Sequence, residues 1–363
     1  MTIRRQLRDS EGIGSLKLLS ALDLPTVAEQ AAGESDGVDE LTRRLAGGAR
    51  ASLDNPSRLH GLRAEAMFRA VLVALGSFQL LVEEDEGQLY YDDAAGPVKL
   101  PDYRAVDADG RQWLVEVKTV PPNPRQLRHS IAATEAHGLR RYGWLTGAPV
   151  TMAHYWSAAN LWTLVDLERM EPRDRRYQLE LADAMKFNQM GRFGDRTVGT
   201  VPPLELRLEV EELGERARPG TATVVIRNTQ LVAAGQPLVD EVEQRIAFLL
   251  FRYGRWDIDT PAEVDAHGRL TSFTLQAAPP EEASEIVNRQ GFAMVGALSS
   301  MYSTLFNEIT LDDQGAVRRL DHHSEPGELA SLIPADYFDR PDRRLKLWVL
   351  HQQPAGEDDH AAS

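Results

Sequence analysis

The chain has 363 residues, 40 of them basic and 55 acidic, and this length is enough for two domains of ordinary size. It contains no cysteine, which excludes a disulfide framework and a thiolate metal site. No apolar run follows the basic residues 1–5 and none is long enough to cross a bilayer, so we expect a soluble cytoplasmic protein without membrane contact.

The negative charge is distributed unevenly along the chain. Residues 1–60 carry 8 basic and 9 acidic side chains, residues 61–170 carry 11 and 14, and residues 171–363 carry 21 and 32. Most of the net charge of −15 therefore lies in the last part. Such a charge disfavours non-specific sliding on nucleic acid, although phosphate binding depends on local Lys and Arg contacts and not on the sum.

Residues 1–54 have the spacing of a loose helical extension, and we find no chemistry there. Asn55 and Pro56 then mark the start of a helix, because a capping residue is followed by proline in the first turn. This helix is predicted to continue to about Leu75 and to end at Gly76. Apolar residues cover nearly all of its faces, so we expect it to be buried.

Two charged side chains interrupt the apolar surface of this helix, Glu65 and Arg69. They are four residues apart, the spacing at which opposite charges pair along a helix. Glu65 therefore either neutralises Arg69 or contributes its carboxylate to a functional site, and the sequence leaves both interpretations open.

A β-hairpin is predicted next, because the β-rich runs 100–106 and 111–120 flank a turn signal at residues 107–110. From Trp113 to Val120 the second run is apolar except at Glu116 and Lys118. They are two residues apart, so they point to the same face of the strand. Charges in such a strand are costly unless they are paired, bound to a ligand or line a cleft.

The length of the hairpin loop decides whether Asp102 joins that face. A two-residue loop would set Asp102 opposite Val117, whereas a three-residue loop over residues 108–110 would set it opposite Glu116. Both loop types are known in hairpins. We favour the three-residue loop because Gly110 suits its left-handed last position and because it brings the charges together.

Pro101-Asp102 and Glu116-Val117-Lys118, carried on two neighbouring strands, resemble the motif of the PD-(D/E)xK nuclease superfamily. Glu65 is similar to the glutamate that a helix before the motif often carries there. The resemblance covers residues 55–168, and it implies an α/β domain of the restriction-endonuclease-like fold, with a mixed sheet flanked by helices. Restriction, junction resolution, exonuclease trimming and defence all use this core, so the cutting pattern stays open.

The resemblance also implies a Mg²⁺-dependent deoxyribonuclease in which Mn²⁺ would substitute. Asp102 and Glu116 would be the metal ligands, with Glu65 as a third carboxylate. Lys118 would orient the attacking water or stabilise developing negative charge, so these four residues are the catalytic candidates. The alternative is an exposed hairpin with an incidental Glu-x-Lys.

Residues 125–141 are predicted to form a helix, and the segment is basic. Arg125 and Arg128 lie near its start, where free backbone N–H groups would favour a phosphate. These two arginines are the candidate DNA-binding residues, with a solvated helix face as the alternative.

Further strands are predicted at residues 77–82 and in a second hairpin at 150–156 and 161–167. Aromatic side chains of this hairpin could stack on bases, but we favour a core role, which is more usual on strands: Tyr155, Trp156 and Trp162.

The domain organisation follows from composition. Residues 55–170 are predicted as the nuclease domain, 171–203 as a linker, 204–353 as a second α+β domain of no recognised family, and 354–363 as a disordered tail. The cluster Asp321-His322-His323 could bind a metal, but no other ligand spacing accompanies it, so a surface loop is favoured.

Together these features predict a metal-dependent DNA endonuclease of defence, restriction or repair, whose acidic C-terminal domain regulates it or binds a protein partner. The alternative of a different class is a non-catalytic subunit that uses the nuclease fold for assembly. A two-fold homodimer is the default arrangement for cutting both DNA strands, although the sequence does not require one. A phosphate-cradling glycine loop with a lysine is absent from the sequence, so it does not support use of ATP.

Overall fold

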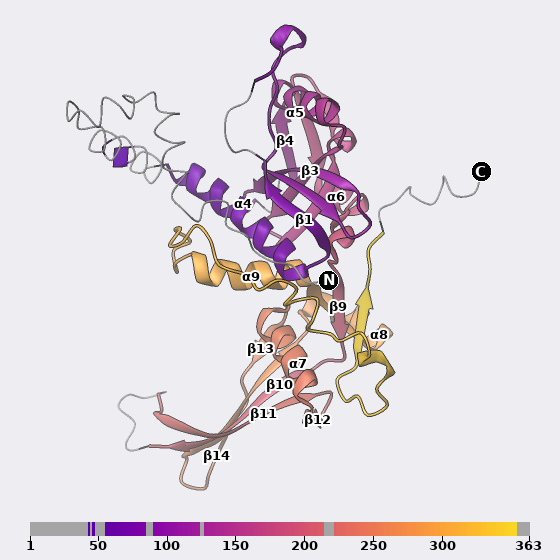
Figure 1. Ribbon diagram of the computed structural model, residues 1–363. Coiled ribbons are helices and arrows are strands. Elements are labelled where there is room, and N and C mark those ends of the chain that lie inside the picture. Colours follow the sequence, from indigo (N-terminus) through magenta and orange to yellow (C-terminus); the bar gives the residue numbers. More distant parts are fainter. Residues whose placement is uncertain are drawn as a thin grey trace, which may run out of the picture.

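The computed structural model describes residues 43, 46, 47, 55–84, 90–123, 127–213 and 221–353. The described chain has a mixed α/β architecture with several sheets (Figure 1). The expected N-terminal extension, apart from three residues, and the expected tail lie outside the described residues. Within the described part of the chain, every helix is too short or too polar to cross a bilayer.

Helix α4 (Pro56–Leu75) has the predicted ends. The Asn55 side chain accepts a hydrogen bond from the Arg58 amide at 3.2 Å, and Gly76 closes the helix in the left-handed conformation with φ of 68°. A left-handed cap favours glycine because it lacks a Cβ. Ten residues of the helix are buried, as the apolar pattern predicted.

A five-stranded sheet carries the predicted motif and has the order β1-β2-β3-β5-β6. Strands β3 and β5 are parallel, and the other neighbours are antiparallel. The sheet is therefore mixed, with the connection from β3 to β5 passing through helix α5 (Ala133–Thr146). The strands are β1 (Phe78–Glu83), β2 (Tyr103–Asp107), β3 (Gln112–Val120), β5 (Val150–Trp156) and β6 (Leu161–Asp166).

The two faces of this sheet belong to different hydrophobic clusters. Val115 and Val117 join the cluster that contains α4, whereas Leu114 joins the cluster that contains Leu139 of α5 (Ala133–Thr146). Because side chains alternate along a strand, Glu116 faces α5 and not α4.

The β2–β3 hairpin has the predicted three-residue loop. Tyr103 lies opposite Val115, and the Asp107 amide donates to the Arg111 carbonyl at 3.0 Å, so residues 108–110 form the loop. Gly110 has a φ of 88°, as the loop type requires. The next pair in this register sets Asp102 opposite Glu116.

The predicted helix over residues 125–141 is wrong at its start. Residues 124–126, including Arg125, lie outside the described residues, and β4 (Arg128–Ala132) follows before α5 begins. Strand β4 pairs antiparallel with β8 (Arg176–Glu180), which pairs with β7 (Glu171–Arg173). Pairing with a distant strand therefore overrides the local helical spacing of this segment.

The expected linker contains regular elements, namely β7, β8 and three others. The others are α6 (Leu181–Lys186), η3 (Met190–Phe193) and β9 (Thr197–Thr200). Outside this segment, shorter 3-10 turns occur at η1 (Asp93–Ala95), η2 (Leu167–Arg169) and η4 (Tyr337–Asp339).

The described residues from 204 to 353 build two more sheets, one of them shared with β9, and three helices. The larger sheet has the order β12-β11-β10-β15-β13, with β14 also paired to β15, and the smaller has the order β16-β9-β17. The strands are β10 (Leu204–Glu212), β11 (Val224–Ala233), β12 (Gln236–Pro237), β13 (Asp257–Asp259), β14 (Ala262–Val264), β15 (Leu270–Ala278), β16 (Ala293–Ala297) and β17 (Leu347–Leu350). The helices are α7 (Glu241–Tyr253), α8 (Glu281–Gln290) and α9 (Leu298–Thr310).

Helix α9 lies beside α4 and joins the C-terminal region to the first sheet (Figure 1). Arg63 of α4 donates to the side chains of Asn307 at 2.8 Å and Thr310 at 3.0 Å. Trp162, fully buried, donates to the Ser303 hydroxyl at 2.9 Å. One hydrophobic cluster therefore runs through both predicted domains.

Candidate active site

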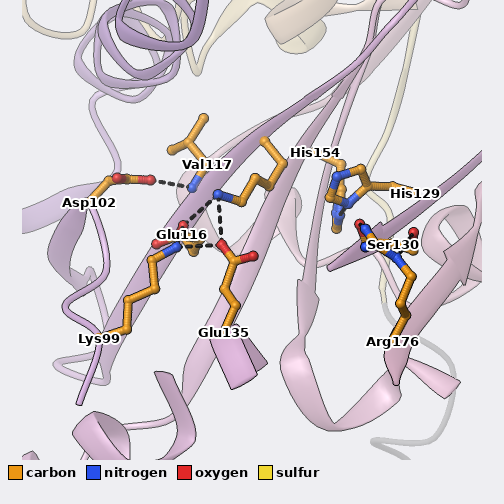
Figure 2. Close-up of polar contacts among 10 residues, drawn as sticks. Lys99, Asp102, Glu116, Val117, His129, Ser130, Glu135, His154 and Arg176 are labelled. Carbon is orange, nitrogen blue, oxygen red and sulfur yellow. Dashed lines mark hydrogen bonds and ion pairs between the residues drawn. The ribbon is translucent and has the colours of Figure 1, made fainter. Parts of the chain in front are cut away.

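Asp102 lies just before β2 and reaches across the hairpin. Its Oδ2 accepts a hydrogen bond of 2.6 Å from the Val117 amide (Figure 2). This bond holds the Asp102 carboxylate next to β3 at the level of Glu116, because Val117 follows Glu116 directly. The predicted loop length thus brings Asp102 level with Glu116, in the middle of β3.

Glu116 is the most buried charged residue of the motif, with 2% of its side chain exposed. Its Oε1 accepts hydrogen bonds from two ammonium groups, Lys118 at 2.7 Å and Lys99 at 2.6 Å. Its Oε2 is buried without a hydrogen-bond partner. A buried carboxylate oxygen without a donor is costly, so this atom is the unsatisfied point of the site.

Lys99, Glu116, Lys118 and Glu135 form a closed ring of ion pairs (Figure 2). Each ammonium contacts both carboxylates, and Lys118 reaches Glu135 Oε1 at 3.1 Å. Lys99 also bonds directly to Glu135. The ring contains two positive and two negative side chains, so its formal charge is balanced.

Electrostatics within the site move the pKa of Asp102 to about 8. Burial is the main cause, and the negative charge of Glu116 adds to it. The hydrogen bond from the Val117 amide and the charge of Lys118 act in the opposite direction. Ionising Asp102 beside Glu116 therefore costs free energy unless a cation binds to the two carboxylates.

The pKa of Lys118 lies above its ordinary value. Burial alone would lower it, but attraction to Glu116 and hydrogen bonding with it, reinforced by Glu135, outweigh burial. Burial likewise opposes ionisation of Glu135, yet its bonds to Lys99 and Lys118 bring its pKa below the ordinary value. Lys118 is therefore a fixed positive charge at neutral pH.

Glu65 lies on α4, the helix before the motif hairpin. Its backbone carbonyl accepts a hydrogen bond of 3.0 Å from the Tyr103 hydroxyl, and its charge helps to raise the pKa of Asp102. Arg69, the alternative partner, bonds to Glu83 and, at 2.6 Å, to Asp321. Glu65 is thus within electrostatic reach of Asp102.

Lys99 and Glu135 were not anticipated from the sequence. Lys99 is the only basic residue between Arg69 and Arg104, and Glu135 is the only acidic residue in 118–141. A charge isolated among opposite charges is the signal that could have identified both, since such residues are placed to neutralise others.

A pair of histidines from two different sheets lies beside Lys118. His154 of β5 is opposite Lys118 in the parallel register, and its Nε2 lies 3.0 Å from His129 Nδ1 of β4. Burial, and next the charge of Lys118, lower the pKa of His129 to about 4. Burial also holds the pKa of His154 well below its usual range, so both rings are neutral at pH 7.

The remaining candidates lie away from the ring or outside the described chain. Arg128 is exposed on β4, and Arg125 lies outside the described residues. Tyr155, Trp156 and Trp162 are buried, which confirms a core role. Across the described ranges, no group of three or more His, Asp or Glu side chains is arranged to hold a metal ion, at the His322–His323 stretch included.

No family model matches the sequence, and no curated protein matches it. Eleven chains of solved structures match. One is the Holliday junction resolvase Hjc from Archaeoglobus fulgidus, an archaeal hyperthermophile, which is 19% identical with a TM-score of 0.25 and covers 32% of this chain and 87% of its own. That resolvase has the restriction-endonuclease-like fold, the fold that the motif resembles. At this score the match adds nothing to the site geometry, on which the assignment of function depends.

Proposed function

We propose that this chain is a metal-dependent nuclease that hydrolyses DNA phosphodiester bonds, with Asp102, Glu116 and Lys118 at its centre. The observation that carries the proposal is the unpartnered, buried Oε2 of Glu116. It lies on the strand that also positions Lys118, and Asp102 is bonded to the amide of the intervening residue. A buried polar group that the protein leaves unsatisfied is typical of a site that completes itself with a ligand.

The residues present fit a hard divalent cation. Such an ion would offset the repulsion between Asp102 and Glu116, which helps to raise the pKa of Asp102. It would also give the buried Oε2 of Glu116 a partner. Mg²⁺ needs only one or two protein carboxylates, because waters and substrate oxygens complete its coordination, and Mn²⁺ has similar ligands. Asp102 and Glu116 would hold the ion, and Glu65 is the proposed additional carboxylate.

Side chains of this protein would then have separate roles at the scissile phosphate. When bound, Mg²⁺ supplies Lewis-acid stabilisation of phosphate charge and lowers the pKa of a water. Lys118, a fixed positive charge, would donate a hydrogen bond from Nζ to the attacking water or to a phosphate oxygen. The β3 backbone keeps Lys118 and Glu116 in a constant relation, since they are alternate residues of one strand.

Phosphate contacts with DNA are proposed for Arg128 of β4 and for Arg125, which lies outside the described residues. By analogy of architecture, the proposal extends to an endonuclease of defence, restriction or repair. It also extends to a two-fold homodimer and to regulation by a partner that binds residues 204–353.

One observation favours the alternative of a non-catalytic assembly subunit. The carboxylates of Glu116 and Glu135 are already neutralised by two lysines, as they would be in a purely structural ion-pair cluster. This alternative predicts no metal-dependent cleavage by the purified chain.

The test is cleavage of plasmid DNA by the full chain with Mg²⁺ or Mn²⁺. Glu116→Gln and Lys118→Met should each lower the rate about 100-fold or more, because each removes a charge needed in the transition state. The matched control is Glu285→Gln, an exposed carboxylate on α8, which should cleave like the parent. Equal cutting by parent and Glu116→Gln would reject the proposal.

A further inference from the structure

Lys99 belongs to the site although it is outside the motif. Its Nζ lies 2.6 Å from Glu116 Oε1 and also bonds to Glu135, so it joins a β-strand carboxylate to a helix carboxylate. Lys118 makes the equivalent contacts at 2.7 Å and 3.1 Å. Glu116 is thus shared by two ammonium groups, of which only Lys118 is part of the motif.

The two lysines are held by different kinds of backbone. Lys118 lies within β3, two residues from Glu116, so the strand fixes its position. Lys99 lies in a segment without helix or strand before β2, and its side chain is 36% exposed. Rotation of the Lys99 side chain toward solvent would leave Lys118, which is less exposed at 26%, beside Glu116.

The packing of α5 accommodates Lys99 closely. Gly138 faces it, and a Cβ at that position would lie 3.0 Å from the Lys99 Cβ and 3.1 Å from its backbone nitrogen. Glycine within a helix is destabilising relative to alanine. Gly138 therefore allows a close approach that a larger residue would prevent, and the approach sets Lys99 against Glu135, one helical turn earlier.

We propose that Lys99 is a positioning residue that competes with the divalent cation for Glu116, so that the ion binds as the Lys99 ammonium leaves. The inference rests on the proposed function, because it takes Glu116 as a metal ligand. A cation on Glu116 would be repelled by two neighbouring ammonium groups, and Lys99 is the one free to move. The released ammonium would then be available to a phosphate of the DNA.

The test measures Mn²⁺ binding to the full chain by isothermal titration calorimetry without DNA. Lys99→Met should bind Mn²⁺ about tenfold more tightly than the parent, the range of a typical coupling between two ligands. Lys99→Arg keeps a competing charge and should stay within about twofold of the parent. Lys346→Met removes an exposed lysine outside the site and should also match the parent.

A second variant separates competition from a long-range effect of charge. Gly138→Ala keeps all charges but crowds Lys99, so it should also tighten Mn²⁺ binding, and it provides the test if Lys99→Met does not fold. The gain should persist at 0.5 M salt, on the order of the ionic strength that screens distant charges. Circular dichroism would check the fold of each variant.

The outcomes separate this inference from the proposed function. Unchanged Mn²⁺ affinity in both Lys99→Met and Gly138→Ala, with cleavage still dependent on Glu116, would overturn the role of Lys99 alone. Failure of every variant to bind Mn²⁺ would overturn both. Tighter binding in Lys99→Met and Gly138→Ala, but not in Lys346→Met, would establish the competition.

Discussion

The Trp113 indole donates a hydrogen bond of 2.9 Å to Asp107 Oδ2, and this buried contact holds the loop of the motif hairpin in place. The other carboxylate oxygen of Asp107 accepts from the amides of Asp109 at 3.0 Å and Arg111 at 2.9 Å. One side chain therefore fixes both the loop and the core tryptophan beside it. The register that sets Asp102 opposite Glu116 depends on this loop.

Asp107→Ala should destabilise the protein by about 2–4 kcal/mol, because three donors lose their acceptor and one of them is fully buried. Urea unfolding followed by tryptophan fluorescence would measure the loss. Asp109→Ala, whose side chain is 82% exposed, is the control and should change stability by less than about 0.5 kcal/mol. Equal effects of the two variants would contradict the role given to Asp107.

Contact between α4 and α9 gives a second prediction. Asn307 accepts from Arg63 and donates to the Tyr155 hydroxyl at 3.1 Å, so Asn307→Ala should cost about 1–3 kcal/mol, because buried Arg63 and Tyr155 each lose one hydrogen-bond partner. Glu308→Gln, which loses only an exposed ion pair with Arg252, should cost less than about 1 kcal/mol. Urea unfolding would measure the loss of stability in both variants. A smaller loss in Asn307→Ala than in Glu308→Gln would contradict the role given to this contact.

The histidine pair predicts a loss of stability in acid. The pKa of His129 is lowered to about 4 by burial first and then by Lys118, so the folded state resists protonation that the unfolded chain accepts near its ordinary pKa. Stability from this group is complete above about pH 6.5 and declines as the pH falls toward 4. His129→Gln should therefore lose less stability than the parent between pH 6.5 and 4.5 in urea titrations. If the free energy of unfolding fell equally with pH in the two proteins, the role given to His129 would be wrong.

Asp102 predicts the opposite dependence in protein without metal. Its pKa is raised to about 8, chiefly by burial, so its contribution is complete below its unfolded value and is lost as the pH rises to 8. Asp102→Asn keeps an acceptor for the Val117 amide but removes the charge, so it should melt higher than the parent at pH 8.5 and similarly at pH 3.5. Thermal unfolding with a chelator present would measure this difference.

Mn²⁺ would reverse that result, since a ligand that binds the folded state stabilises it. With excess Mn²⁺ at pH 8.5, the parent should melt higher than without it, and Asp102→Asn should gain less. An equal gain in both would mean that Asp102 does not contribute to the ion's binding.

Much of the motif's local structure could be predicted from the sequence, because local signals determine it. Pro56 and Gly76 fix the ends of α4, and Gly110 fixes the hairpin loop, each through its own backbone preference. Strand β4 could not be predicted, because its partner β8 lies more than 40 residues further along the chain and the local spacing fits a helix. Tertiary pairing of this kind leaves little trace in a single segment.

The site itself was predictable only in its core. Asp102, Glu116 and Lys118 belong to one hairpin, so register and alternation place them. Lys99 and Glu135 reach the same point from a loop and from α5, and no local rule relates those segments. The ring therefore arises from packing, which the sequence alone does not specify.

Helix α9 covers the same apolar cluster as α4, and Phe68, Trp162 and Phe306 meet within it. A chain truncated after residue 203 would leave Phe68 and Trp162 facing water, so we expect it to aggregate instead of folding. The helix that bears Glu65 would thereby lose its packing partner α9. We therefore expect a protease cut within α9 to destabilise the sheet that carries Glu116, although the cut lies outside that sheet.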